Sequence, residues 1–124
     1  MRLFALTFAA ILFAAPAAFA CSCAPDDSAA AQQILSNPSY SVADVTVRGF
    51  NTHNGQSMLQ INSIRHGNLM ARDIRAKFDS QSSCGVVPSQ KQMTLIIHND
   101  ADGRYSIAGQ CATMAVLKHL KVGQ

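Results

Sequence analysis

The sequence Asp73-Ile74-Arg75-Ala76-Lys77-Phe78-Asp79 alternates strictly between charged and apolar side chains. Successive side chains of a β-strand point to opposite faces of a sheet, so this alternation predicts a strand that is buried on one face only. Ile74, Ala76 and Phe78 are expected to face a hydrophobic core, and the charged residues are expected to face solvent. The stretch therefore indicates a fold built on a β-sheet.

Four weaker strand patterns accompany this one. They cover residues 43–48, 57–65, 91–98 and 104–108, and turn-forming residues separate them at 49–55, 66–68 and 99–103. The strand at 91–98 is the most apolar and is expected to be the most buried. Five short strands with hairpin-like connections predict a small β-barrel, because closure of the sheet removes exposed edges.

Two short helices are expected beside the barrel. Asp26-Asp27-Ser28 is a helix-start signal ahead of an apolar run to Leu35, and Pro38 ends the pattern. Residues 112–121 predict a second helix that covers the core. Its predicted core-facing residues are Met114, Leu117 and Leu120 or Lys121. The expected fold class is all-β with short flanking helices, specifically a five-stranded Greek-key barrel of the OB type.

Composition limits the function classes. The chain has 124 residues, enough for one domain, and 48% of them are hydrophobic, which excludes an intrinsically disordered protein. The formal net charge is only +3, so the dense basic surface of a nucleic-acid-binding protein is not expected. Single-strand binding would also need aromatic stacking platforms, which are few here. The basic residues considered for that role, and interpreted instead as a solvated strand face, are Arg65, Arg72, Arg75 and Lys77.

The first 20 residues have the pattern of a secretory signal peptide. Arg2 precedes an apolar run over residues 3–15, and Ala18-Phe19-Ala20 forms an A-x-A cleavage site. The apolar run is shorter than the roughly 20 residues needed to span a bilayer. The predicted organisation is a signal peptide at 1–20 and a single domain at 21–124, secreted or periplasmic. Lipid anchoring at Cys21 is the alternative, although Ala18 and Phe19 fit a lipoprotein signal poorly.

All four cysteines, Cys21, Cys23, Cys84 and Cys111, follow the predicted cleavage site. An even number of cysteines in a small exported domain predicts two disulfides. A Cys21–Cys23 bridge would close a very tight ring, so each early cysteine is expected to pair with a late one. A four-thiolate zinc site is the alternative, but its ligands usually come as two close pairs, and Cys84 and Cys111 are far apart.

Four motifs together resemble the tissue inhibitors of metalloproteinases, whose domain is of the netrin-like type. They are Cys21-Ser22-Cys23-Ala24-Pro25, the strand end at 61–67, Ser82-Ser83-Cys84-Gly85-Val86, and the Asp102-Gly103 turn that leads to Cys111. The order and spacing agree along nearly the whole of 21–124. The resemblance implies an OB barrel with flanking helices and the disulfides Cys21–Cys84 and Cys23–Cys111.

The resemblance also implies an inhibitory mechanism. The α-amine and carbonyl of Cys21, freed by signal cleavage, would chelate the catalytic zinc of a target protease, and the chain would need no cofactor of its own. Ser22 would enter the first primed specificity pocket, and Ser82 and Ser83 would line neighbouring subsites. The implied contact residues are Cys21, Ser22, Cys23, Ala24, Pro25, Ser82 and Ser83.

Two departures from the family leave a second function open. No cysteine lies between Cys23 and Cys84, so the family's third disulfide in this domain is missing, and the turn at 51–56 is too short for a protease-touching hairpin. Netrin-like modules also occur in proteins that inhibit no protease. The alternative is therefore a binding or structural module of the cell envelope. The expected partner is a zinc metalloprotease or another envelope protein.

Other site types are weakly supported. His53, His66, His98 and His119 are scattered without metal-ligand spacing, and a turn explains Asp100 and Asp102 without calcium or zinc. The chain has no Glu and no G-x-S-x-G elbow. It is therefore not expected to be an enzyme, and no small-molecule substrate is expected.

Overall fold

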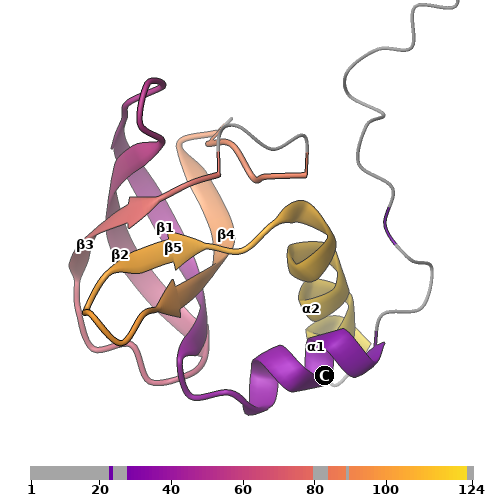
Figure 1. The fold of residues 1–124 in the computed structure, drawn as a ribbon. Coiled ribbons are helices and arrows are strands. Elements are labelled where there is room, and N and C mark those ends of the chain that lie inside the picture. Colours follow the sequence, from indigo (N-terminus) through magenta and orange to yellow (C-terminus); the bar gives the residue numbers. More distant parts are fainter. Residues whose placement is uncertain (1–22, 24–27, 80–83, 89, 123–124) are drawn as a thin grey trace, which may run out of the picture.

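The computed structural model describes residues 23, 28–79, 84–88 and 90–122, and Figure 1 shows the arrangement of these parts. The predicted signal peptide, residues 1–20, lies outside the described residues. In chain order the elements are α1 (Ser28–Ser36), β1 (Tyr40–Phe50), β2 (Gln56–His66), β3 (Asp73–Lys77), β4 (Gln92–Asn99), β5 (Tyr105–Ile107) and α2 (Gln110–Val122).

The five strands form a closed barrel in the order β1-β2-β3-β5-β4, which confirms the predicted all-β, OB-like fold. Four of the strand pairs are antiparallel, and β3 and β5 are parallel. The parallel pairing is short, with Ala76 opposite Tyr105 and Lys77 opposite Ser106. Closure leaves no strand without a neighbour on each side, which protects a small sheet from edge-to-edge association.

The alternation at 73–79 has the predicted consequence. Ile74, Ala76 and Phe78 are buried in the barrel interior, whereas the charged residues between them are exposed. Phe78 follows the last residue of β3 and packs edge-to-face on Phe50, with ring centroids 5.8 Å apart. The barrel core therefore continues past the end of β3 into the chain that follows it.

A second apolar layer lies between the barrel wall and the helices. Val42 of β1 and Ile96 of β4 are direct cross-strand partners, and both are buried under α1 and α2 with Ala31 and Val116. Figure 1 shows the two helices on one side of the barrel, where α1 crosses the lower end of α2 and packs against it. In β4, Leu95 and Ile97 fill the interior while Ile96 meets the helices. The predicted burial of this strand is confirmed, because both of its faces are covered.

The closing helix α2 is confirmed, but one of its predicted core residues is wrong. Met114 is 63% exposed, whereas Val116 is fully buried and Leu117 and Leu120 pack beside it. Successive helical residues are about 100° apart, so Met114 lies roughly 200° around the helix from Val116. Lys121, the alternative to Leu120, is exposed.

The turn between β4 and β5 forms as predicted. The Gly103 amide donates to the Asp100 carbonyl oxygen (2.9 Å), and the Asp100 amide donates to that of Arg104 (2.8 Å). Gly103 has a φ of 75°, a conformation that side chains other than glycine rarely adopt. Of the helices in the described residues, none is long and apolar enough to cross a membrane.

We expect Ile96→Ala to lower the unfolding free energy by about 2–5 kcal/mol, because it opens a cavity between the barrel and the helices. Met114→Ala is the matched control and should stay within about 0.5 kcal/mol of the parent, since it removes an exposed side chain. Urea denaturation of both variants measures the difference. Equal effects would show that the helices contribute little to the burial of β4.

Candidate functional site

One disulfide joins the start of the described chain to the start of α2. Cys23 is bonded to Cys111, with Cα atoms 5.2 Å apart, and the bond spans 88 residues of sequence. This is one of the two pairings that the family resemblance implies. In the chain-entropy model a closed loop of this length stabilises the fold by about 4–5 kcal/mol. Residue 23 is thereby held against the first turn of α2.

The segment around Cys84 meets the same turn. The Gln110 amide donates to the Cys84 carbonyl oxygen (2.8 Å), and Gln110 Nε2 donates to the Gly85 carbonyl oxygen (3.2 Å). Gln110 is the direct neighbour of Cys111, so one hydrogen bond, one peptide link and one disulfide connect residue 84 to residue 23. We call this arrangement of Cys23, Cys84, Gly85, Gln110 and Cys111 the N-terminal junction.

Two glycines allow the junction to form. Gly85 is buried, and a Cβ atom at this position would lie 1.8 Å from the Asp79 carbonyl oxygen. A Cβ atom at Gly109 would lie 3.0 Å from the Cys84 carbonyl oxygen. The chain that follows β3, the segment after Cys84 and the start of α2 therefore approach one another more closely than larger residues allow.

Of the predicted contact residues, the structure describes Cys23, which belongs to the junction together with Cys84, the residue that directly follows the predicted contact residues Ser82 and Ser83. Cys23 and Cys84 meet there, and Cys84 is itself disulfide-bonded. The other predicted contact residues, Cys21, Ser22, Ala24, Pro25, Ser82 and Ser83, lie outside the described residues. The Cys21–Cys84 pairing and the inhibitory ridge therefore stay predictions.

Sequence reasoning missed Gln110 as part of the junction, and it missed Asp79 and Gly109 as residues that lie close against it. Gly109 directly precedes a helix that starts next to a paired cysteine, a weak local signal that could have suggested a close approach. The Asp79–Gly85 contact has no such signal, because it depends on how the chain beyond β3 returns to the barrel.

The histidines lie at separate places. His98 Nδ1 donates to Asp100 Oδ1 (2.7 Å), and its ring lies 4.5 Å from that of Tyr40. His66 Nε2 donates to the Leu35 carbonyl oxygen (2.6 Å), which ties the end of β2 to α1. In the part of the chain that the structure describes, no three His, Cys, Asp or Glu side chains come close enough to hold a metal ion.

A polar cluster on the outer faces of β1, β2 and β4 centres on Asp44. Its carboxylate accepts hydrogen bonds from Thr94 Oγ1 (2.5 Å), Ser63 Oγ (2.9 Å) and Arg65 Nε (3.1 Å). The Thr94 hydrogen bond, followed by those of Arg65 and Ser63 and by the Arg65 charge, outweighs partial burial and lowers the Asp44 pKa from its ordinary value of 3.8. Because every partner lies on a neighbouring strand, the cluster serves to hold the sheet together.

No sequence family, no characterised protein and no solved structure matches this chain.

We expect Gly85→Ala to destabilise the fold by about 1–3 kcal/mol, because the new Cβ must displace a backbone oxygen. Hydrogen exchange of the Gln110 amide should accelerate in the same variant, since its acceptor on Cys84 moves. Gly49→Ala is the control, because a Cβ there meets nothing within 4 Å. Unchanged Gln110 exchange in Gly85→Ala would contradict the close packing of the junction.

We expect Asp44→Asn to destabilise the fold most at neutral pH. The Asp44 pKa is lowered in the folded state, so its contribution is complete above the ordinary pKa and is lost as the pH falls through the folded value. The difference in unfolding free energy between parent and variant should therefore narrow below about pH 4. Asp73→Asn, at an exposed position on β3, is the control. Urea denaturation of the parent and both variants from pH 3 to 7 measures this difference. A difference in unfolding free energy between parent and Asp44→Asn that does not change with pH would contradict the prediction.

Proposed function

We propose that this chain is an exported inhibitor of a zinc metalloprotease and that it acts through the amino terminus created at Cys21. The observation that carries the proposal is the N-terminal junction. Cys23, two residues after the proposed terminus, is bonded to Cys111, and Gln110 beside it holds Cys84 and Gly85. The two sequence segments that would contact a protease are thus anchored to one rigid point.

The chemistry of the terminus supports this function. A free α-amine has a pKa of about 7.7–8.0, so roughly a tenth to a sixth of it is neutral at pH 7, and this neutral form can donate its lone pair to a metal. Together with the Cys21 carbonyl oxygen it forms a bidentate ligand for a zinc ion. A catalytic zinc with three protein ligands holds a water at its fourth position, and the two donor atoms of the chelate would displace that water and make the zinc five-coordinate.

The junction supplies the rigidity that such an inhibitor needs. A flexible terminus would lose conformational freedom on entering an active site, and that loss weakens binding. The disulfide at Cys23 and the hydrogen bonds of Gln110 restrict the chain before binding. Ser22 would then reach the first primed pocket, with Ser82 and Ser83 in neighbouring subsites.

The short turn between β1 and β2 favours the second candidate, a non-inhibitory binding or structural module of the cell envelope. β1 ends at Phe50 and β2 begins at Gln56, so only five residues connect the two strands and no long loop extends beyond them. Contact with a protease would depend on the terminal and Cys84 segments alone. A module without inhibitory activity would use the same junction for stability only.

Intact mass and N-terminal sequencing of the secreted protein test the first requirement. We expect a chain that starts at an unmodified Cys21 and contains no free thiol. A fatty acid on Cys21, or a start at another residue, would remove the chelating amine and rule out the mechanism.

Inhibition of a panel of zinc metalloproteases tests the second requirement. One alanine added before Cys21 should abolish inhibition, because it moves the amine away from the carbonyl that completes the chelate. One alanine added after Gln124 is the control and should leave potency unchanged. Potency should also fall by about tenfold per pH unit below the amine pKa, as the proton competes with zinc. Retained inhibition in the N-terminally extended protein would exclude chelation, and no inhibition of any protease would favour the envelope module.

A further inference from the structure

The outer face of β3 carries two positive charges, Arg75 and Lys77. The residues that alternate with them are buried in the barrel core, so both cations point away from the barrel and are exposed. Across the β2–β3 pair, Arg75 lies opposite Met58 and Lys77 lies opposite Gln56. Opposite charges on neighbouring strands stabilise a sheet, yet neither cation of β3 faces a carboxylate across the β2–β3 pair. Both charges therefore remain available to an anion from outside the barrel.

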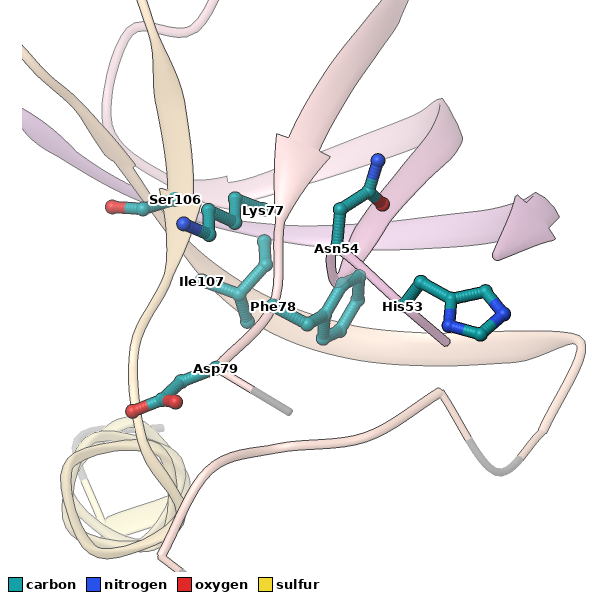
Figure 2. A pocket seen from close by; sticks show the side chains of 7 residues that line it. All are labelled: His53, Asn54, Lys77, Phe78, Asp79, Ser106 and Ile107. Carbon is teal, nitrogen blue, oxygen red and sulfur yellow. The ribbon is translucent and has the colours of Figure 1, made fainter. Parts of the chain in front are cut away.

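The neighbouring strand β5 adds a third cation and a hydroxyl group to the same face. β3 and β5 are parallel, and Lys77 is the register partner of Ser106. Figure 2, a view of the pocket at the end of β3, shows the Lys77 ammonium group beside Ser106. Two residues earlier on each chain segment, the same register brings the exposed Arg104 beside Arg75. We call these four side chains the cationic seam.

The seam presents its donors as two pairs. Arg75 and Arg104 form the first pair, and Lys77 and Ser106 form the second, about 6.5–7 Å further along the strands. Neighbouring strands are only about 5 Å apart, so one carboxylate can accept hydrogen bonds from both members of a pair. Within the residues that the structure describes, none of the four side chains forms an ion pair or a hydrogen bond. An anion at the first pair would also relieve the repulsion between its two arginines.

A carboxylate lies at one end of the seam. Asp73 is two residues before Arg75 on the same exposed face of β3, and its register partner on β2 is Gln60. A ligand whose negative charges continued past Arg75 in this direction would meet Asp73 and be repelled. The seam therefore favours a ligand with two carboxylates over a long run of negative charge.

We propose that the cationic seam binds an extended acidic segment of a partner protein, with carboxylates at positions i and i+2. Alternate side chains of an extended chain point to the same side and are about 6.5–7 Å apart, which matches the spacing of the two donor pairs. The first carboxylate would lie between Arg75 and Arg104, and the second between Lys77 and Ser106. The proposal is independent of protease inhibition.

The position of the seam favours a polypeptide over a free dicarboxylic acid. Lys77 and Ser106 line the pocket at the end of β3, whereas Arg75 and Arg104 do not. A ligand that contacts both donor pairs must therefore run along the outer wall of the barrel. Small-molecule sites are concave and enclose most of their ligand, but an extended polypeptide can bind along an open surface.

Two peptides of the same composition test the proposal by titration of the ¹⁵N-labelled protein at low ionic strength. Acetyl-Ser-Asp-Ser-Asp-Ser-amide should shift the backbone amides of residues 74–77 and 104–107. In acetyl-Ser-Asp-Asp-Ser-Ser-amide the two carboxylates point to opposite sides of an extended chain, so only one reaches the seam. We expect this peptide to bind about threefold more weakly, the effect of one exposed ion pair. Equal binding of the two peptides, or no shift at about 10 mM peptide, would overturn the proposal.

Two double variants assign the binding to the seam. Arg75→Gln combined with Lys77→Gln removes one cation from each donor pair and should weaken binding of the alternating peptide by about tenfold, because two ion pairs are lost. Lys118→Gln combined with Lys121→Gln removes the same net charge from exposed positions of α2 and should bind as the parent does. The amide spectrum itself reports whether each variant is folded. Equal losses in both variants would show attraction to the net charge of the protein alone and would overturn the assignment.

Pimelate distinguishes a protein segment from a small dicarboxylic acid. It carries two carboxylates at a comparable spacing but has no peptide backbone. We expect pimelate to bind more weakly than the alternating peptide, because the peptide makes further contacts along the strands. Pimelate binding as tightly as the peptide would overturn the assignment of a protein segment as the ligand.

Discussion

The structure depends on the burial of β4 on both faces. Leu95 and Ile97 fill the barrel, and Ile96 between them pairs with Val42 under the two helices. A barrel this small has a limited interior, so a single core stabilises it only marginally. The helices add a second apolar layer, and the Cys23–Cys111 bond attaches the beginning of the chain to one of them. The position of the N-terminal junction therefore follows from the packing that covers Ile96.

The sequence predicts most of this fold where one face of a strand is buried and the other is not. The stretch at 73–79 alternates because β3 has solvent on its outer face, and its inward residues were predicted correctly. The prediction was less complete at the start of β1, where Ser41, Val42 and Ala43 are all buried. The register also shifts between Val42 and Ala43. Burial on both faces and a bulge each remove the two-residue period, so the strand begins earlier, at Tyr40, than its pattern indicates.

The candidate site could be predicted only in part, for a different reason. Cysteine number and compartment predict disulfides, and the family resemblance supplied the Cys23–Cys111 pairing that the structure contains. The contacts that complete the junction are made by a backbone carbonyl at Asp79, a backbone amide at Gln110 and the missing side chain of Gly85. These contacts involve backbone groups or the absence of a side chain, so no pattern of side chains in the sequence predicts them. On α2, Met114 was predicted to face the core but is exposed. Helical spacing alone does not decide which of two apolar stripes on a helix packs against the barrel.

The chain at the end of β3 joins the barrel core to the N-terminal junction. Phe78 is fully buried against Phe50, and its amide donates to the Gly55 carbonyl oxygen, so its displacement would disrupt the barrel core. The next residue, Asp79, places its carbonyl oxygen 1.8 Å from where a Cβ atom of residue 85 would lie. The junction is therefore positioned twice, by the Cys23–Cys111 disulfide on one side and by the core residue Phe78 on the other. Because a closely packed core does not deform continuously, the segment that begins at Cys84 is held in one position relative to the barrel.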